Sequence, residues 1–253
     1  MSLIFVSDVV KKISDEFSLT DISFEIEEKG IYGFLGKSGS GKTLLCEILA
    51  GAREIDEGSV VYKDRPLYKK ARTTAEIKKK IGYVPHKCFF DGDMTVTEVM
   101  DLIGTARGVD PDKRYRQIKE ALELLGLSLK TATLVEDLTL AEKKRLSIAA
   151  ALIGNPEVLI MDEPFGYLEG QQADEIARLI RMLGQKKVVL MFTARASYVE
   201  KLADTTAFIC NGQLALWENT AELMEKLSGN GLGGLAAALD AFNEEDVREE
   251  DEE

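Results

Sequence analysis

The sequence predicts an α/β fold with a mostly parallel sheet, an N-terminal antiparallel β-subdomain and an inserted helical subdomain. Three observations support this prediction. A glycine-rich turn at residues 36–43 separates an apolar run from a helical segment. The continuous apolar run at 158–161, and the segment 187–192, which is apolar after Lys187, are typical of strands that a parallel sheet buries on both faces. Between residues 91 and 155, apolar residues recur instead at the three- and four-residue spacing of helices.

Length and charge limit the domain organisation and the class of partner. The chain has 253 residues, of which 45% are hydrophobic, enough for one large domain or a core with a subdomain. We expect one domain over residues 1–228 and then a glycine linker, a short helix (235–242) and an acidic tail over 229–253. The net charge is −12, and residues 244–253 carry eight acids and one arginine. This acidity argues against nucleic acid as the main partner and predicts a disordered, solubilising tail.

Three further features predict a cytoplasmic protein. Cys46, Cys88 and Cys210 share no metal-ligand spacing and suggest a reducing compartment. The N-terminus has no cationic segment followed by an apolar run, so no signal peptide is expected. No apolar stretch approaches the ~20 residues of a membrane span.

The first strands flank the glycine-rich turn in sequence. Residues 2–10 and 22–26 alternate apolar and polar side chains, which is typical of half-buried strands. Residues 58–67 predict a hairpin strand that ends in a turn. Together these segments predict the antiparallel β-subdomain.

The turn itself has the spacing G-x-x-x-x-G-K-[ST], which predicts a phosphate-binding loop and a P-loop NTPase core. Glycines let successive N–H groups point at phosphate oxygens, and the following helix N-terminus adds unpaired donors. Lys42 reaches the β- and γ-phosphates of a nucleotide, which gives it a catalytic role, and the Thr43 hydroxyl can bind Mg²⁺. The alternative is a purely structural turn. The expected nucleotide-binding residues are Gly36, Lys37, Ser38, Gly39, Ser40, Gly41, Lys42 and Thr43.

The helical block follows a short strand at 81–85 that proline ends. Thr95 and Glu98 have the spacing of a capping box, which predicts a helix start. Tyr115 lies on the predicted apolar face of a later helix, and Gly126 ends that helix. The block therefore predicts a helical insertion over about 91–155.

An acidic pair, Asp162 and Glu163, follows the buried strand 158–161. The carboxyl ends of parallel strands are where such sheets bind ligands. We expect Asp162 to hold Mg²⁺, directly or through water, and Glu163 to polarise the attacking water as the catalytic base. The alternative is a solvated strand end without function.

The C-terminal third continues the α/β pattern. Residues 172–183 and 199–203 predict helices on either side of the strand 187–192. Asn211-Gly212 predicts a hairpin between 207–210 and 214–216.

These motifs together resemble the ATPase subunit of ATP-binding-cassette (ABC) transporters over nearly the whole chain. The resemblance rests on residues 31–36 leading into the phosphate loop, 81–85 before the Q-loop, 94–98 and 149–156. The sequences of residues 31–36 and 235–242 are most similar to those of ATPases that serve drug, antibiotic or polysaccharide exporters.

The resemblance implies several partners and ligands. Two ATPase subunits, identical or different, would face head to tail and sandwich Mg-ATP between them. A separate membrane-spanning subunit would dock on the helical subdomain, so the chain would lie at the inner face of the cell membrane. Ile13 aligns with the family's adenine-stacking aromatic, with Phe17 nearby.

The chain departs from the family's signature sequence, Leu-Ser-Gly-Gly-Gln. After Leu138, the aligned residues are Thr139, Leu140, Ala141 and Glu142. Both glycines, which let the helix approach the partner's γ-phosphate, are missing. Glu142 either brings a carboxylate near that phosphate or closes a capping box with Thr139.

Two other motifs are altered. His86 replaces the Q-loop glutamine, and Ala194 replaces the switch histidine, with Arg195 next to it as a replacement charge if the loop shifts by one residue. Tyr167 makes the loop after the acidic pair bulkier than in the family. We therefore expect a subunit that binds Mg-ATP and drives export but hydrolyses ATP slowly on its own. The alternative is a soluble, ATP-dependent dimerising switch without transport.

Overall fold

The computed structural model describes residues 2–14, 17–88, 90–229 and 233–250. Its main sheet has six strands in the order β10-β9-β3-β8-β7-β6. All neighbours in it are parallel except β10, which forms a hairpin with β9. The strands are β3 (Gly30–Leu35), β6 (Ile81–Val84), β7 (Val158–Asp162), β8 (Val188–Thr193), β9 (Thr205–Cys210) and β10 (Gln213–Asn219).

A second sheet lies beside the first and is antiparallel throughout, in the order β2-β1-β4-β5. This confirms the predicted β-subdomain. Its strands are β1 (Ile4–Lys12), β2 (Ser18–Ile26), β4 (Glu57–Tyr62) and β5 (Arg65–Pro66).

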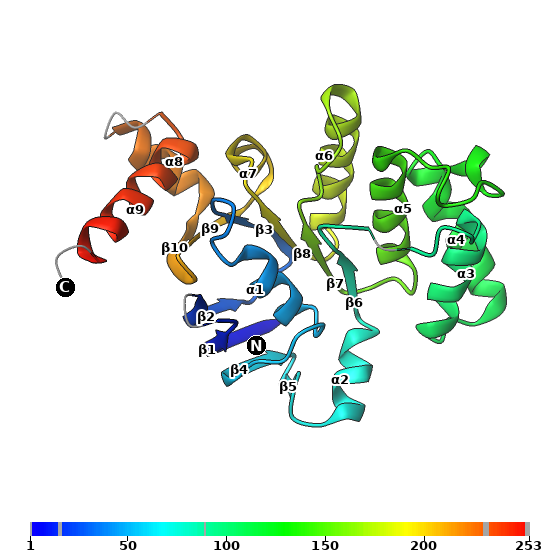
Figure 1. The fold of residues 1–253 in the computed structure, drawn as a ribbon, viewed down its shortest axis with the longest axis horizontal. Helices are drawn as coiled ribbons and strands as arrows, with labels where there is room; N and C mark the ends of the chain where they lie inside the picture. Colours follow the sequence, from blue (N-terminus) through cyan, green and yellow to red (C-terminus); the bar gives the residue numbers. More distant parts are fainter. Residues whose placement is uncertain (1, 15–16, 89, 230–232, 251–253) are drawn as a thin grey trace.

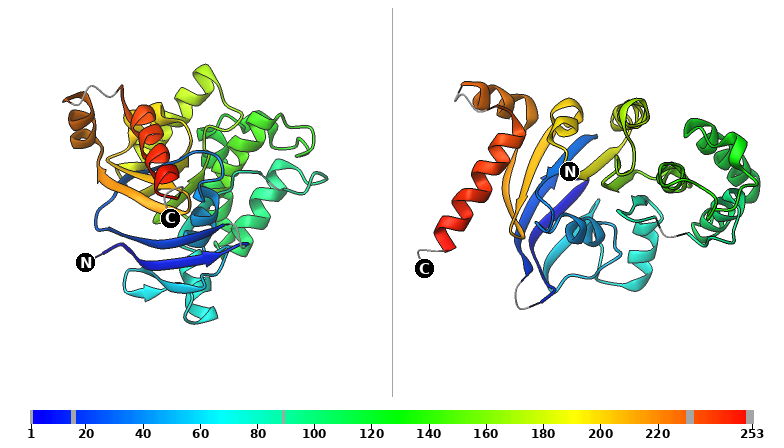
Figure 2. Two further views of the ribbon diagram at one scale, coloured as in Figure 1. Left: turned by 60° about the vertical axis from the view of Figure 1, so that its left-hand side comes forward. Right: turned by 45° about the horizontal axis from the view of Figure 1, so that its top comes forward.

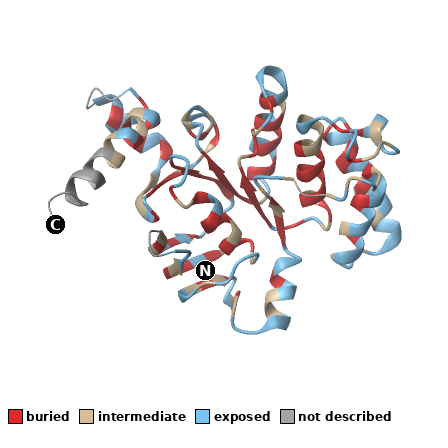
Figure 3. Cartoon of the chain, in the orientation of Figure 1, coloured by how far each residue is buried: buried red, intermediate tan, exposed pale blue. Residues whose placement is uncertain are grey.

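The main sheet separates two cores (Figures 1 and 2). One face packs on α1 (Lys42–Leu49) and the antiparallel sheet, and the other on α6 (Gly170–Gly184) and α7 (Ala196–Leu202). Every residue of β3, β7 and β8 is buried, as Figure 3 shows for the central strands. Burial on both faces explains why these strands are almost entirely apolar, with Asp162 and Thr193 as the polar residues at the ends of β7 and β8.

Aromatic rings connect the two sheets. Trp217 of β10 stacks on Phe24 of β2, with ring centres 4.9 Å apart, and on Tyr32 of β3 at 5.8 Å. Phe34 of β3 stacks in turn on Phe192 of β8 at 4.3 Å. The two sheets therefore share one packed interior.

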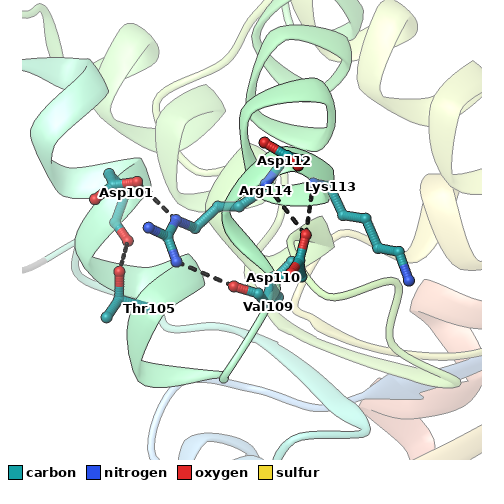
Figure 4. A network of polar contacts seen from close by, with 7 residues as sticks. All are labelled: Asp101, Thr105, Val109, Asp110, Asp112, Lys113 and Arg114. Carbon is teal, nitrogen blue, oxygen red and sulfur yellow. Dashed lines mark hydrogen bonds and ion pairs between the residues drawn. The ribbon is translucent and has the colours of Figure 1, made fainter.

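The helical block stands at one end of the molecule (Figure 1). Arg114 joins two of its helices, because its guanidinium donates to the Asp101 carboxylate at 2.7 Å and to the Val109 carbonyl at 3.0 Å (Figure 4). Asp110 caps the second helix by accepting from the N–H of Asp112. The block contains α3 (Val96–Ala106), α4 (Pro111–Leu124), the 3₁₀ turn Ser128–Lys130 and α5 (Leu140–Leu152).

Several predicted local signals are confirmed. Thr95 and Glu98 form both hydrogen bonds of a capping box at the start of α3. Gly126 follows α4 with φ 67°. Asn211 and Gly212 have φ of 43° and 81° at the turn between β9 and β10, the left-handed geometry that a tight hairpin needs.

Three features were missed or predicted wrongly. The helices α2 (Ala71–Lys78) and α8 (Thr220–Gly229) were not predicted. Tyr115 is 75% exposed and does not belong to the apolar face of α4. A tyrosine can tolerate this position because its hydroxyl is polar, and Ile118 and Leu122 suffice to bury the helix.

The C-terminal helix is longer than predicted. Instead of a short helix at 235–242 followed by a disordered tail, α9 spans Leu235–Glu250. Leu235, Ala238 and Leu239 are buried and anchor its first turns, and the alanines and glutamates that follow favour helix. Residues 230–232 of the predicted linker and 251–253 of the tail lie outside the described residues.

Candidate functional site

The predicted phosphate loop lies between the end of β3 and the start of α1. Gly41 precedes the helix with φ 101°, and no side chain caps the helix start. A Cβ on Gly36 would lie 2.4 Å from the Ile209 carbonyl oxygen, and one on Gly41 would lie 2.6 Å from a methyl carbon of Leu19. Glycine is therefore required at both positions, and the N–H groups of the first turn face an open loop.

Lys42 lies folded into this loop. Its side chain is buried, and Nζ donates to the carbonyl oxygens of Gly36 and Lys37, each at 2.7 Å. Burial lowers the pKa of the amine, while the nearby Glu163 and Asp162 act against that shift. The loop thus holds an ammonium donor at its centre, and phosphate oxygens can replace its two carbonyl acceptors.

The residues at the metal site fit Mg²⁺. The Thr43 hydroxyl donates to Oδ2 of Asp162 at 2.8 Å, which joins the start of α1 to the end of β7. Asp162 is 1% exposed, and its Oδ1 has no hydrogen-bond partner among the described residues. Burial raises the pKa of this carboxyl. A buried carboxylate oxygen without a donor, next to a hydroxyl, matches the oxygen ligands that Mg²⁺ prefers.

Glu163 is held by the strand next to it. Its carboxylate accepts from the Thr193 hydroxyl at 2.9 Å and from the Ala194 N–H at 2.7 Å. Its own backbone has φ 46°, a left-handed conformation that is uncommon outside glycine. Such strain often accompanies functional sites, and here it turns the carboxylate toward the end of β8.

A cavity of about 680 Å³ brings most of the predicted residues together. Its wall includes the half-exposed Ile13 together with His86 and Ala194. The remaining lining residues are Phe17, Ser38, Gly39, Gly41, Lys42, Thr43, Leu44, Glu47, Arg53, Asp162, Glu163, Gly166 and Tyr167. The volume, and a lining that contains both apolar side chains and the polar groups of the phosphate loop, suit a nucleotide.

Some predicted residues do not line this cavity. Ser40 of the loop is buried, and Lys37 forms an ion pair with Asp240 of α9 at 2.9 Å. Arg195 donates to the Leu168 carbonyl at 3.4 Å rather than to the cavity. The replacement charge suggested for Arg195 is therefore not in place in this structure.

Thr139, Leu140, Ala141 and Glu142 lie at the start of α5, outside the cavity. Thr139 and Glu142 form the two hydrogen bonds of a capping box, and Lys130 forms an ion pair with Glu142 at 3.1 Å. The hydrogen bond from the Thr139 N–H, and the Lys130 charge, lower the pKa of the Glu142 carboxyl. This structure therefore supports the capping alternative, while Leu140 stands 58% exposed beside it.

Sequence reasoning missed one residue close to the site. Lys144 of α5 is 0% exposed, and its Nζ donates to the carbonyl oxygens of Pro85 and His86 at 3.1 Å and of Asp162 at 3.4 Å. A lysine within a helix gives no signal in a single sequence, because most lysines are exposed.

The comparisons with known proteins agree with this geometry. The family model described as ABC transporter matches residues 19–166. The chain is 30% identical to the Nod factor export ATP-binding protein I of Burkholderia lata, over 81% of this chain and 67% of that relative. It is 31% identical to the bacitracin transport ATP-binding protein BcrA of Bacillus licheniformis, over 84% of this chain and 68% of that relative. Relatives named for import match over a similar share of the chain.

Solved structures share the fold. A dimeric ATP-binding cassette in a post-hydrolysis state, bound to ADP and Pi, has a TM-score of 0.79 and 21% identity, covering 86% of this chain and 98% of that one. Fold, phosphate loop and family model agree, and the chain belongs to the ABC transporter family as an ATP-binding subunit.

Proposed function

We propose that this ATP-binding subunit holds Mg-ATP in the cavity between the phosphate loop and the end of β7 and drives export through a separate membrane subunit. Residues 36–43 cradle the phosphates, Lys42 contacts the β- and γ-phosphates, and Thr43 and Asp162 hold Mg²⁺. Glu163 orients the attacking water. Ile13 lies against the adenine, and His86 faces the metal and the water.

One observation carries this assignment. Thr43 and Asp162 come from positions far apart in sequence, yet they form a hydrogen bond of 2.8 Å beside the buried Lys42. The Oδ1 of Asp162, which has no partner among the described residues, then supplies a ligand position that a cation or its bound water would satisfy.

We also propose that hydrolysis by the isolated subunit is slow. Ala194 offers only its backbone N–H, which Glu163 already accepts, where the family has a histidine side chain. His86 replaces the Q-loop glutamine, and the capped Glu142 stands where a glycine-rich segment would meet a partner's phosphate. Positioning and acid–base groups are commonly worth ~10²–10⁴ in rate, so these losses should slow turnover markedly.

The assembly follows from the family. A second ATPase subunit, identical or different, supplies the opposite half of each site, and residues 91–155 form the helical subdomain of the ATPase domain 1–228.

The complex places the chain at the cytoplasmic face of the membrane. In the described part of the chain, no helix is both long and apolar enough to span a membrane. Export as the direction of transport is supported by the exporter-like sequence of residues 31–36 and by the similarity to the Nod factor export ATP-binding protein I.

The test uses Glu163→Gln, which keeps the site's shape but removes the base, so that ATP stabilises the closed dimer. The tagged variant is purified from native membranes with Mg-ATP, and Lys42→Ala serves as the control that cannot hold nucleotide. Recovery of a membrane subunit with the Gln variant supports transport. A soluble partner without any membrane subunit would support the dimerising switch instead. Turnover of several ATP per second by the isolated wild-type subunit would refute slow hydrolysis.

A further inference from the structure

Lys144 is buried without a carboxylate partner. Its side chain is 0% exposed, and none of the ion pairs among the described residues includes it. The ammonium has three donors, and the structure gives it three carbonyl acceptors, at 3.1, 3.1 and 3.4 Å. Taking an ammonium out of water is costly unless its donors are satisfied, so the three carbonyls explain how the charge is tolerated.

The three carbonyls belong to two separate parts of the site. Pro85 and His86 follow β6, and Asp162 ends β7 and carries the carboxylate that faces Thr43. The side chain of Lys144 also lies under the turn after Glu163, because a Cβ on Gly166 would be 3.6 Å from its Cε. One ammonium thus holds the loop of His86 and the metal-binding strand end at a fixed separation.

The lysine itself comes from a third element. It lies on α5, five residues after Thr139 and two after Glu142, and α5 is the helix of the inserted block that packs on β6. Any rotation of α5 therefore pulls on the backbone of His86 and of Asp162 through the same three hydrogen bonds.

We propose that Lys144 is a positioning residue that fixes the Asp162 carboxylate for Mg²⁺ and couples this metal site to the helix presenting residues 139–142. This inference rests on the proposed function. It also explains why a costly charge occupies a position where leucine or methionine would fill the space. Groups that orient a metal ligand without touching the metal are commonly worth about 10- to 100-fold in metal affinity or activity.

The test compares Lys144→Met with Lys144→Gln in the full chain. ATP affinity is measured by calorimetry in EDTA and again in Mg²⁺, and the ratio reports the metal's contribution. We expect Lys144→Met to bind ATP in EDTA within about twofold of wild type, because the phosphate loop is untouched, and to lose about tenfold of the gain that Mg²⁺ gives. Lys144→Gln keeps two donors on a side chain one bond shorter, so it should recover part of that gain.

Lys143→Met is the matched control. Among the described residues, the neighbouring Lys143 donates to the Glu136 carbonyl, at 3.2 Å, and not to the carbonyls that Lys144 contacts, so its loss should leave both affinities unchanged. Thermal unfolding of each variant separates a structural role, which would lower stability and both affinities together, from positioning, which lowers only the gain from Mg²⁺.

The outcomes are distinct for the two proposals. If wild type and Lys42→Ala bind Mg-ATP equally, the proposed function fails, and the role of Lys144 fails with it. If wild type binds Mg-ATP at the phosphate loop and Lys144→Met keeps the whole gain from Mg²⁺, only the role of Lys144 is refuted.

Discussion

Asp162→Asn should stabilise the metal-free protein while it abolishes Mg²⁺ binding. Asp162 is 1% exposed, burial raises the pKa of its carboxyl, and Oδ1 has no partner among the described residues. A buried, unsatisfied polar group costs ~1–3 kcal/mol, and more when it is charged. Asparagine keeps an oxygen for the Thr43 hydroxyl and removes the charge, so we expect the free energy of unfolding to rise by about 1 kcal/mol.

The assay is thermal unfolding of the full chain in EDTA and in Mg-ATP. For a domain of this size, 1 kcal/mol corresponds to a shift of roughly 2–4 °C in Tm. Mg-ATP at one hundred times its Kd should raise the free energy of unfolding of wild type by a further ~2.7 kcal/mol. Most of the Mg²⁺-dependent share of this stabilisation should be missing in the variant. Glu163→Gln is the matched control, since it changes the adjacent carboxylate but leaves the Thr43–Asp162 hydrogen bond intact.

The reasoning is refuted if Asp162→Asn is less stable than wild type in EDTA. That outcome would mean that the Asp162 carboxylate stabilises the metal-free fold, instead of destabilising it until a cation binds.

Three further results are expected. The gain in ATP affinity from Mg²⁺ should fall as the pH is lowered, because Mg²⁺ needs the ionised Asp162. Since burial raises the pKa of this carboxyl, the fall should start at a higher pH than it would for an exposed aspartate. ATP titrations in EDTA at each pH provide the baseline. Thr139→Ala should lower the free energy of unfolding by about 1 kcal/mol in urea denaturation, since it removes the cap of α5, and an unchanged midpoint would contradict the capping assignment. Ala194→His should raise phosphate release by at least about tenfold, and a rate equal to wild type would show that the missing histidine does not limit turnover.

The sequence was sufficient for elements whose local chemistry allows one structure. The glycines at 36 and 41 have no room for a Cβ, so the spacing of glycines in the sequence was enough to predict the conformation of the loop. The capping box of Thr95 and Glu98 was predicted, and that of Thr139 and Glu142 was one of two alternatives, because a threonine and a glutamate three residues apart satisfy each other's backbone donors. The apolar runs of β7 and β8, which end in Asp162 and Thr193, likewise predict strands covered on both faces.

The sequence was insufficient where tertiary contacts decide. The length of α9 depends on three apolar residues that anchor it, and the acidic composition alone predicted disorder. The role of Lys144 depends on carbonyls contributed by residues about 20 and 60 positions away. Which oxygen of Asp162 stays unpaired is also a property of the assembled site, because it depends on the approach of Thr43.

The aromatic stack around Trp217 allows conformational changes to be followed by the intrinsic fluorescence of the protein. This is the chain's single tryptophan, and its ring lies against Phe24 of the antiparallel sheet and against Tyr32 and Phe34 of the main sheet. Indole emission responds to small changes in the packing of its neighbours, so a tilt of the antiparallel sheet against the parallel one would alter a signal that needs no label. Nucleotide titrations can therefore be followed on unmodified protein, and Phe24→Leu would identify how much of the signal comes from the antiparallel side.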